Sequence, residues 1–192
     1  RGIFTMRWFW CLRRFAAASV LRCSPLNRAL AAWRKFMVRD AQIKDLDVLI
    51  SLFIAENEHN SDLAPDVVRK TEDVLNETEL QDILSDESQL LIVSEHDGKV
   101  VGALLGNLTS VKARRWTQSR TYGYIEELIV SSEARNLGVA TGLVSYFSEW
   151  ASALGASSVD LHVWSNNKGA IGFYTSVGFE SKRNLLSKKL RS

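Results

Sequence analysis

The sequence predicts an α/β domain in which a group of hairpin-linked strands is followed by strands that helices connect. Three observations support this prediction. The chain is 46% hydrophobic and 24% charged, a composition typical of a globular protein that buries a core. Two strand-like runs meet at Asp97-Gly98, a dipeptide that favours a tight hairpin turn. After a third strand-like run at 124–130, apolar residues recur with the period of a helix.

The first elements are expected to be one short strand and two helical regions. Residues 36–40 are expected to form the strand, and the helical period of the apolar residues predicts a helix over 45–57. Pro65 is well placed to open the second helical region. Asn76 is expected to divide that region, with further helical turns after it.

The middle of the chain is expected to contain three strands linked by turns. Strands are predicted at 89–95, 99–109 and 124–130, and a basic loop at 110–120 joins the last two. A helix with one apolar stripe is expected over 138–154.

The end of the chain is expected to hold one more strand, a short helix and a final strand or hairpin. Gly155 is expected to end the preceding helix as its C-cap. Alternation predicts a strand at 158–164, and a short helix is expected over 167–176. A turn at 177–180 is expected to lead into the last strand, which ends near Leu190.

Residues 1–36 differ in composition from the rest of the chain. They hold eight Lys and Arg and both cysteines, Cys11 and Cys23, but no Asp or Glu. This composition is typical of a mitochondrial or plastid transit peptide, or of a basic amphipathic helix at a membrane surface. The alternative is upstream sequence translated ahead of Met37. We therefore expect one domain at 37–192, cytoplasmic if the native chain starts at Met37, and mitochondrial or plastid if the basic segment is a targeting signal.

Residues 37–192 are acidic, with 16 Lys and Arg against 22 Asp and Glu. Nucleic-acid binding calls for a basic surface, so no nucleic-acid partner is expected. The region has no apolar run of membrane-spanning length, and without cysteine it is expected to contain neither a disulfide framework nor a Cys metal site. Its acids are expected to form solvated helix faces or, alternatively, a rim that attracts a cationic substrate. The sequence leaves a homodimer open.

The stretch 124–143 has the features of an anion-binding site. A strand, a polar turn and a loop of small residues lead directly into a helix. The unpaired N–H groups of the first helical turn and the helix dipole favour a bound anion at that point. Gly138 and Ala140 leave room for a phosphate to approach the backbone.

Two motifs resemble those of the GNAT superfamily, the acyl-CoA-dependent N-acetyltransferases. The run Arg135-Asn-Leu-Gly138-Val-Ala140 resembles the family's Arg/Gln-x-x-Gly-x-Gly/Ala loop, and residues 167–179 resemble its Asn-x-x-Ala-x-x-Phe-Tyr-x-x-x-Gly-Phe segment. The resemblance covers residues 37–190. It implies a mixed, mostly antiparallel central sheet of six to seven strands flanked by about four helices, with the fourth and fifth strands splayed. It also implies acetyl-CoA as co-substrate and no metal.

The resemblance also implies a cofactor site. The pyrophosphate of CoA would rest on the loop that Arg135 begins, and the pantetheine arm would pair with the edge of the strand before it. Asn167 would meet the cofactor arm or act as the N-cap of its helix, and both roles are compatible. The cofactor-binding residues expected on this basis are Leu128, Ile129, Val130, Arg135, Asn136, Leu137, Gly138, Val139, Ala140, Thr141, Gly142, Asn167, Phe173 and Tyr174.

The implied reaction is direct attack of a primary amine on acetyl-CoA in a ternary complex. Tyr174 matches the family's frequent acid for the departing thiolate; the alternative is a ring that only packs against CoA. A backbone N–H of Ile129 or Val130 suits the developing oxyanion. Glu126 and Glu127 are the candidate bases, with a water chain as the alternative. Since neighbouring strand residues face opposite sides, only one glutamate is expected to face the substrate.

A further resemblance favours Glu126 as the base. The run Tyr-Ile-Glu-Glu-Leu is similar to the Tyr-Leu-Glu-Asp run of spermidine/spermine acetyltransferases, which places their proposed base at Glu126. We expect an N-acetyltransferase with a small-molecule amine or polyamine-like acceptor. The alternatives are transfer to a protein N-terminus or lysine and, in another class, an acyl-CoA-binding module without catalysis.

Overall fold

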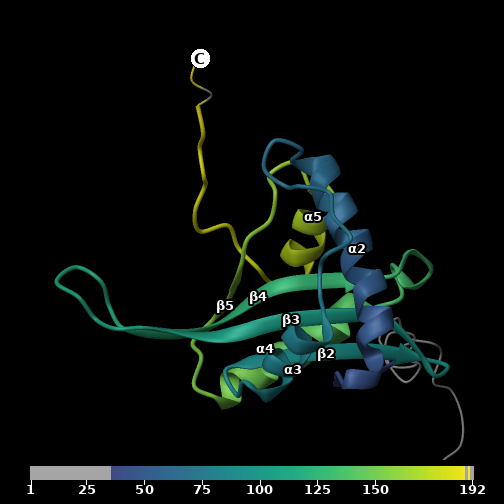
Figure 1. Cartoon of the computed structure of the whole chain (residues 1–192). Coiled ribbons are helices and arrows are strands. Elements are labelled where there is room, and N and C mark those ends of the chain that lie inside the picture. Colours follow the sequence, from purple (N-terminus) through teal and green to yellow (C-terminus); the bar gives the residue numbers. More distant parts are fainter. Residues whose placement is uncertain (1–35, 189, 191–192) are drawn as a thin grey trace, which may run out of the picture.

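The computed structural model describes residues 36–188 and 190, and within them it contains a single five-stranded sheet in the order β1-β2-β3-β4-β5 (Figure 1). Neighbouring strands run antiparallel except β4 and β5, which are parallel. The strands are β1 (Met37–Asp40), β2 (Gln89–His96), β3 (Lys99–Val111), β4 (Arg120–Val130) and β5 (Val159–Leu161).

Helices cover both faces of the sheet. Along β2, Leu91 and Val93 pack with α2 and α3, whereas Ile92 packs with α4 on the opposite face. This alternation follows from the two-residue period of a strand. The helical elements are η1 (Ile43–Asp45), α2 (Leu46–Leu63), α3 (Glu77–Ser85), η2 (Ser132–Ala134), α4 (Val139–Ala153) and α5 (Lys168–Ser176).

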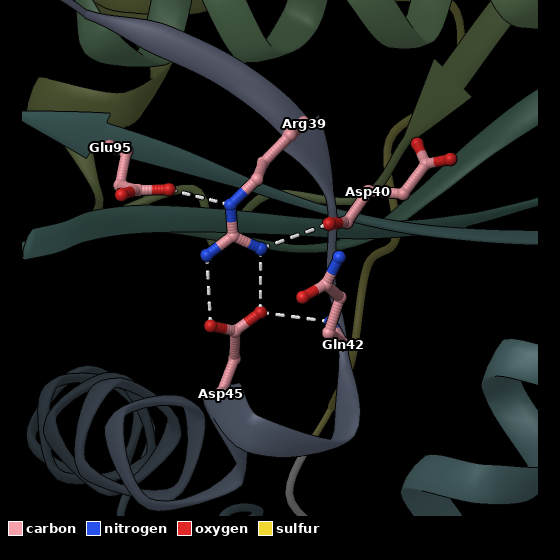
Figure 2. A network of polar contacts seen from close by, with 5 residues as sticks. All are labelled: Arg39, Asp40, Gln42, Asp45 and Glu95. Atoms are coloured by element: carbon pink, nitrogen blue, oxygen red, sulfur yellow. Dashed lines mark hydrogen bonds and ion pairs between the residues drawn. The ribbon is translucent and has the colours of Figure 1, made fainter. Parts of the chain in front are cut away.

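A bidentate ion pair fixes the corner between β1 and α2. The two terminal nitrogens of Arg39 lie 2.7 and 2.9 Å from the carboxylate oxygens of Asp45, and its Nε lies 2.6 Å from Glu95 on β2 (Figure 2). Asp45 is buried, which by itself would raise its pKa, but the hydrogen bonds from Arg39 outweigh this effect and lower the pKa. Two parallel hydrogen bonds between a guanidinium and a carboxylate fix the relative orientation of the two groups as well as their distance. It therefore orients the start of α2 relative to the sheet.

β4 contains a β-bulge at Glu126. Leu105 pairs with Glu127 and Gly106 pairs with Ile125, so Glu126 is left without a partner in the ladder. In a regular strand Ile125 and Ile129 would face the same side. Here Ile125 packs with α4 and Ile129 with α2 and α3. The extra residue therefore reverses the alternation within β4.

Gly106 lies beside this bulge and permits close packing of α4 on the sheet. A Cβ atom at Gly106 would lie 2.6 Å from the Phe147 ring and 2.7 Å from the carbonyl oxygen of Tyr124. Phe147 is completely buried. The glycine therefore makes room for the ring at the centre of the α4 face.

The predicted fold class is confirmed, and the local turn predictions hold. Asp97 and Gly98 both have positive φ, as a tight hairpin of this type requires. Asn76 caps α3 by accepting a hydrogen bond from the Glu79 N–H. Gly155 has a φ of 84° after the end of α4.

Three details differ from the sequence prediction. The sheet has five strands in the described residues, one or two fewer than the resemblance implied. Residues 64–76 form no helix, and α2 instead extends to Leu63. The predicted last strand is absent, since residues 177–188 contain no strand. The adjacent Leu185 and Leu186 do not alternate with polar residues, and they are 96% and 90% exposed.

No helix in the described part of the chain is both long and apolar enough to cross a membrane. Except for Phe36, the basic segment 1–36 lies outside the described residues, and so do the predictions made for it.

Candidate active site

The start of α4 has the geometry that anion binding requires. Gly138 precedes the helix with a φ of 89°, and Asn136 also has positive φ. The N–H of Gly142 donates to the Gly138 carbonyl as the first turn of the helix closes, which leaves the N–H groups before it without intrahelical partners. A Cβ atom at Gly138 would meet nothing within 4 Å. Open space therefore lies beside the helix terminus, which suits a pyrophosphate.

β4 and β5 separate next to this terminus. They pair only over Gly123–Ile125 and Val159–Leu161, and β4 then continues to Val130 without a ladder partner on that side among the described residues. The hydroxyl of Tyr124 lies 2.6 Å from Nδ1 of His162 where the strands part. The splaying that was predicted for the fourth and fifth strands is therefore present. It provides the free edge to which an extended ligand adds by strand pairing.

The other predicted cofactor residues lie on the elements around this fork. Arg135 donates from its Nε to the carbonyl of Val130 at 3.4 Å, which ties the loop to the end of β4. The side chain of Asn167 accepts from the Ala170 N–H, so its predicted role as an N-cap of α5 is confirmed. Phe173 packs with the α4 cluster. The residues predicted to contact the cofactor therefore come from β4, the loop before α4, the first turn of α4, and α5.

A cavity of about 720 Å³ opens on the opposite side of β4, between β4, α2, α3 and the loop at 64–76. The side chain of Asn57 connects this loop to α2. It donates a hydrogen bond to the Arg69 carbonyl and accepts one from the Thr71 N–H. In the described part of the chain, the cavity lining includes no Lys, Arg or His. It includes six carboxylic acids, from Glu56, Asp73, Glu79, Asp82, Glu126 and Glu127.

Both strand glutamates line this cavity. Neighbouring strand residues were expected to face opposite sides, but here the two glutamates share one cavity, because the bulge suspends the usual alternation at Glu126. Their surroundings differ. Glu126 is exposed and accepts a hydrogen bond from the Asn107 side chain on β3. Glu127 is largely buried against α2.

Glu127 forms a carboxyl–carboxyl pair with Glu56 on α2. Burial and then the nearby Glu127 charge raise the pKa of Glu56 to about 10. Burial also raises the pKa of Glu127, but the hydrogen bond from Glu56 opposes that rise. Glu56 is thus protonated at neutral pH and is the member of the pair that donates the hydrogen bond to Glu127.

The hydroxyl of Tyr174 on α5 lies near enough to the pair for the two glutamates to affect its pKa. Burial first, and then the charges of Glu56 and Glu127, raise the pKa of the Tyr174 hydroxyl. The hydroxyl therefore stays protonated at neutral pH, as a proton donor must. Its ring packs edge-on to Phe179 and is tilted against Phe173.

Glu56 is the site residue that sequence reasoning missed. It lies three and seven residues after Phe53 and Leu49, two buried residues of α2, so it continues their apolar stripe. A single acid on an apolar stripe was the signal that could have identified Glu56, because a carboxyl that is buried needs a hydrogen-bonding or charged partner. That partner lies 71 positions later in the chain, and no local pattern links the two.

Among the described residues no group of three or more His, Cys, Asp or Glu is arranged to hold a metal ion. The site consists of a helix terminus, a free strand edge, a tyrosine and a carboxyl pair.

Comparisons with known proteins agree with this geometry. The family model of the acetyltransferase (GNAT) family matches residues 52–179. An uncharacterized N-acetyltransferase of Methanocaldococcus jannaschii is 34% identical over 90 residues, which are 47% of this chain and 38% of the relative. The chain thus matches well under half the length of that relative.

Solved structures share the fold. A mutant of a Bacillus halodurans protein superposes with a TM-score of 0.77 at 21% identity, over 81% of this chain and 99% of the other. The enzyme AAC(6')-Iy, in complex with the bisubstrate analogue CoA-S-monomethyl-acetylneamine, gives a TM-score of 0.60 at 17% identity, over 82% of this chain and 99% of the other. With two thirds of its length matched by the family model, the chain belongs to the acetyltransferase (GNAT) family.

Proposed function

We propose that the protein transfers the acetyl group of acetyl-CoA to a primary amine of a small, cationic acceptor. One observation above all supports this proposal. The strand that ends at the cofactor fork also presents Glu127 to an acidic cavity, with Tyr174 close by. A donor amine and a thioester bound on the two sides of β4 would therefore meet between a base and an acid.

The charge of the cavity supports a cationic acceptor. Six carboxyl groups line it without a basic side chain among the lining residues, so its potential favours ammonium groups over anions. Two solved structures of similar fold contain ligands of related chemistry. One is the acetylneamine bisubstrate complex, and the other is an aminoglycoside acetyltransferase from a soil metagenome in complex with sisomicin. A small polyamine or amino sugar fits this pattern better than a neutral amine.

The proximity of the side chains supports the following proton movements. The acceptor arrives as an ammonium ion, and Glu127 takes one proton from it to give the neutral amine. The amine nitrogen attacks the thioester carbon, and the strand N–H groups at Ile129 or Val130 would stabilise the oxyanion. When the C–S bond breaks, the Tyr174 hydroxyl protonates the thiolate, and the product amide returns its extra proton to the resulting phenolate. The net products are the acetylated amine, free CoA and one proton.

The two glutamates have different proposed roles. Glu127 is buried beside a proton donor, which suits a base whose protonation state must change during turnover. Glu126 is exposed and bonded to Asn107, which suits a fixed charge that attracts the acceptor. The structure therefore supports Glu127 over Glu126 as the base.

Thiol release from acetyl-CoA with a panel of amines tests the function. We expect turnover with diamines, polyamines and amino sugars, weaker turnover with monoamines of equal length, and none with acidic peptides. Acetyl-CoA should raise the melting temperature and NAD should not. Turnover of a protein N-terminus or lysine peptide, with polyamines inactive, would refute the small-molecule acceptor. Binding of acetyl-CoA without turnover of any amine would indicate a non-catalytic binding module.

A matched pair of variants tests the roles of the two glutamates. Glu127→Gln should lower kcat by about 100-fold or more, because it removes the base while keeping the side-chain volume. Glu126→Gln should chiefly raise KM for the cationic acceptor. The reverse pattern would show that Glu126 is the base.

A further inference from the structure

We infer that Glu56 is a positioning residue for the proposed base: it shares one proton with Glu127 and so holds that carboxylate ionised and directed into the acceptor cavity. This inference rests on the proposed function but adds a residue from a different element. Among the described residues, Glu56 is the side-chain donor that stabilises the charge of the buried Glu127.

The packing of α2 brings Glu56 to the bulge of β4. The helix is held there by the burial of Leu49, Leu52 and Phe53 on the same stripe. The Glu56 carboxyl then meets the Glu127 carboxyl and the backbone N–H of Leu128. The contact therefore follows from the core packing of α2 and does not depend on a flexible surface side chain.

The environment of the Glu56 carboxyl favours its protonated form. Its Oε2 is fully buried and receives no hydrogen bond from any N–H or hydroxyl group of the described residues. A buried polar oxygen without a partner is costly, and two ionised carboxylates in contact would also repel each other. A proton on Glu56 removes the repulsion between the two carboxylates, because the protonated carboxyl donates to Glu127. The pair then resembles the shared-proton dyads of acid–base sites.

The charged groups of the described residues around the pair include no alternative counter-charge. Glu126 and Tyr124 on β4 and Tyr174 on α5 are the groups whose electrostatics couple to the pair. The remaining ionisable groups that line the cavity are all acids: Asp73, Glu79 and Asp82. Among the described residues that line the cavity, no cation is present to neutralise Glu127 before the substrate arrives. The shared proton therefore moderates its charge until an ammonium group enters.

The proton count through the step is consistent with this arrangement. Before the reaction the pair holds one proton, on Glu56. When the acceptor ammonium ion loses a proton to Glu127, the pair holds two protons and is neutral. After the acetylated product leaves, Glu127 releases its proton to solvent and the hydrogen bond from Glu56 is restored. Glu56 itself neither gains nor loses a proton, so it acts only through Glu127.

Three variants of the full chain separate positioning from a structural role. Glu56→Gln keeps a neutral hydrogen-bond donor, and Glu56→Leu keeps the volume without a donor. Glu58→Gln is the control, since it removes an acid from the same helix at an exposed position that pairs with Lys70. The readout is the pH profile of kcat/KM with the best acceptor amine of the panel.

We expect the acid limb of the profile to move up by about one pH unit in Glu56→Leu, because Glu127 then lacks the bond that keeps it ionised. Glu56→Gln and Glu58→Gln should keep the limb within about 0.3 unit of the wild type. An unmoved limb in Glu56→Leu, or an equal shift in Glu56→Gln, would overturn the inference.

Carboxyl ¹³C NMR of glutamate-labelled protein, assigned with Glu127→Gln, tests the pair without any activity. The Glu127 resonance should titrate at higher pH in Glu56→Leu than in the wild type. Identical titrations would refute the pairing even if acetyl transfer is observed. A shifted titration in a protein that releases no thiol would keep the pairing and refute the proposed function.

Discussion

Replacing Glu56 with glutamine should stabilise the folded protein, and the gain should grow as the pH rises. Burial and the neighbouring Glu127 raise the pKa of Glu56 from 4.5 to about 10. The folded chain therefore keeps a proton that the unfolded chain releases above pH 4.5. With a raised folded-state pKa, stability is greatest below 4.5 and is lost progressively until about pH 10. Glutamine has nearly the same shape and has no proton to lose.

The magnitude follows from the same shift. Each pH unit above 4.5 costs the wild type about 1.4 kcal/mol of unfolding free energy through this one group. At pH 7 the accumulated cost is about 3 kcal/mol, a large fraction of the stability of an ordinary domain. Glu56→Gln should therefore match the wild type only below about pH 4.5 and exceed it by about 3 kcal/mol at pH 7.

Urea unfolding at pH 5, 6, 7 and 8, followed by far-UV circular dichroism, measures this difference. The wild-type free energy should fall more steeply with pH than that of Glu56→Gln, with the m-value unchanged. Glu58→Gln on the exposed side of α2 should follow the wild-type curve. Parallel curves for wild type and Glu56→Gln, or a less stable variant at pH 8, would refute the assignment of a buried neutral carboxyl to Glu56.

Three further predictions concern the cofactor loop, the proposed acid and the core. Gly138→Ala should cost about 1 kcal/mol because of its φ of 89°, and it should weaken acetyl-CoA binding in calorimetry. Gly155→Ala, at a φ of 84° beyond the other end of α4, should lose similar stability but no affinity; an equal loss of affinity would contradict the loop assignment. Tyr174→Phe should lower kcat by about 100-fold with little change in acetyl-CoA affinity, and unchanged turnover would reject the acid role. Gly106→Ala should destabilise the fold by about 2 kcal/mol, because its methyl group would lie 2.6 Å from the Phe147 ring. Adding Phe147→Leu should then cost less in Gly106→Ala than in the wild type, and simple additivity would show that the ring is not the obstacle.

Much of the fold could be predicted from the sequence because its cues are local. Asp97-Gly98 is sufficient for a tight hairpin, and Asn76 and Asn167 each cap a helix with their own side chain. The motif around Gly138 needs only a positive φ and a following helix to form an anion site. Where the local cue was weak, the prediction failed. Pro65 did not begin a helix, and the segment after it is instead hydrogen-bonded to α2 through the side chain of Asn57.

The sequence by itself determined the family, the loop at the start of α4, and the splayed strands that would accept acetyl-CoA. Only the tertiary structure decided how the acids are arranged. Glu126 has no partner in the ladder, and this bulge lets both strand glutamates line the same cavity. The packing of α2 then places Glu56 against Glu127. The physical reason is that register and helix docking depend on the whole core, and burial makes two distant carboxyls share one proton.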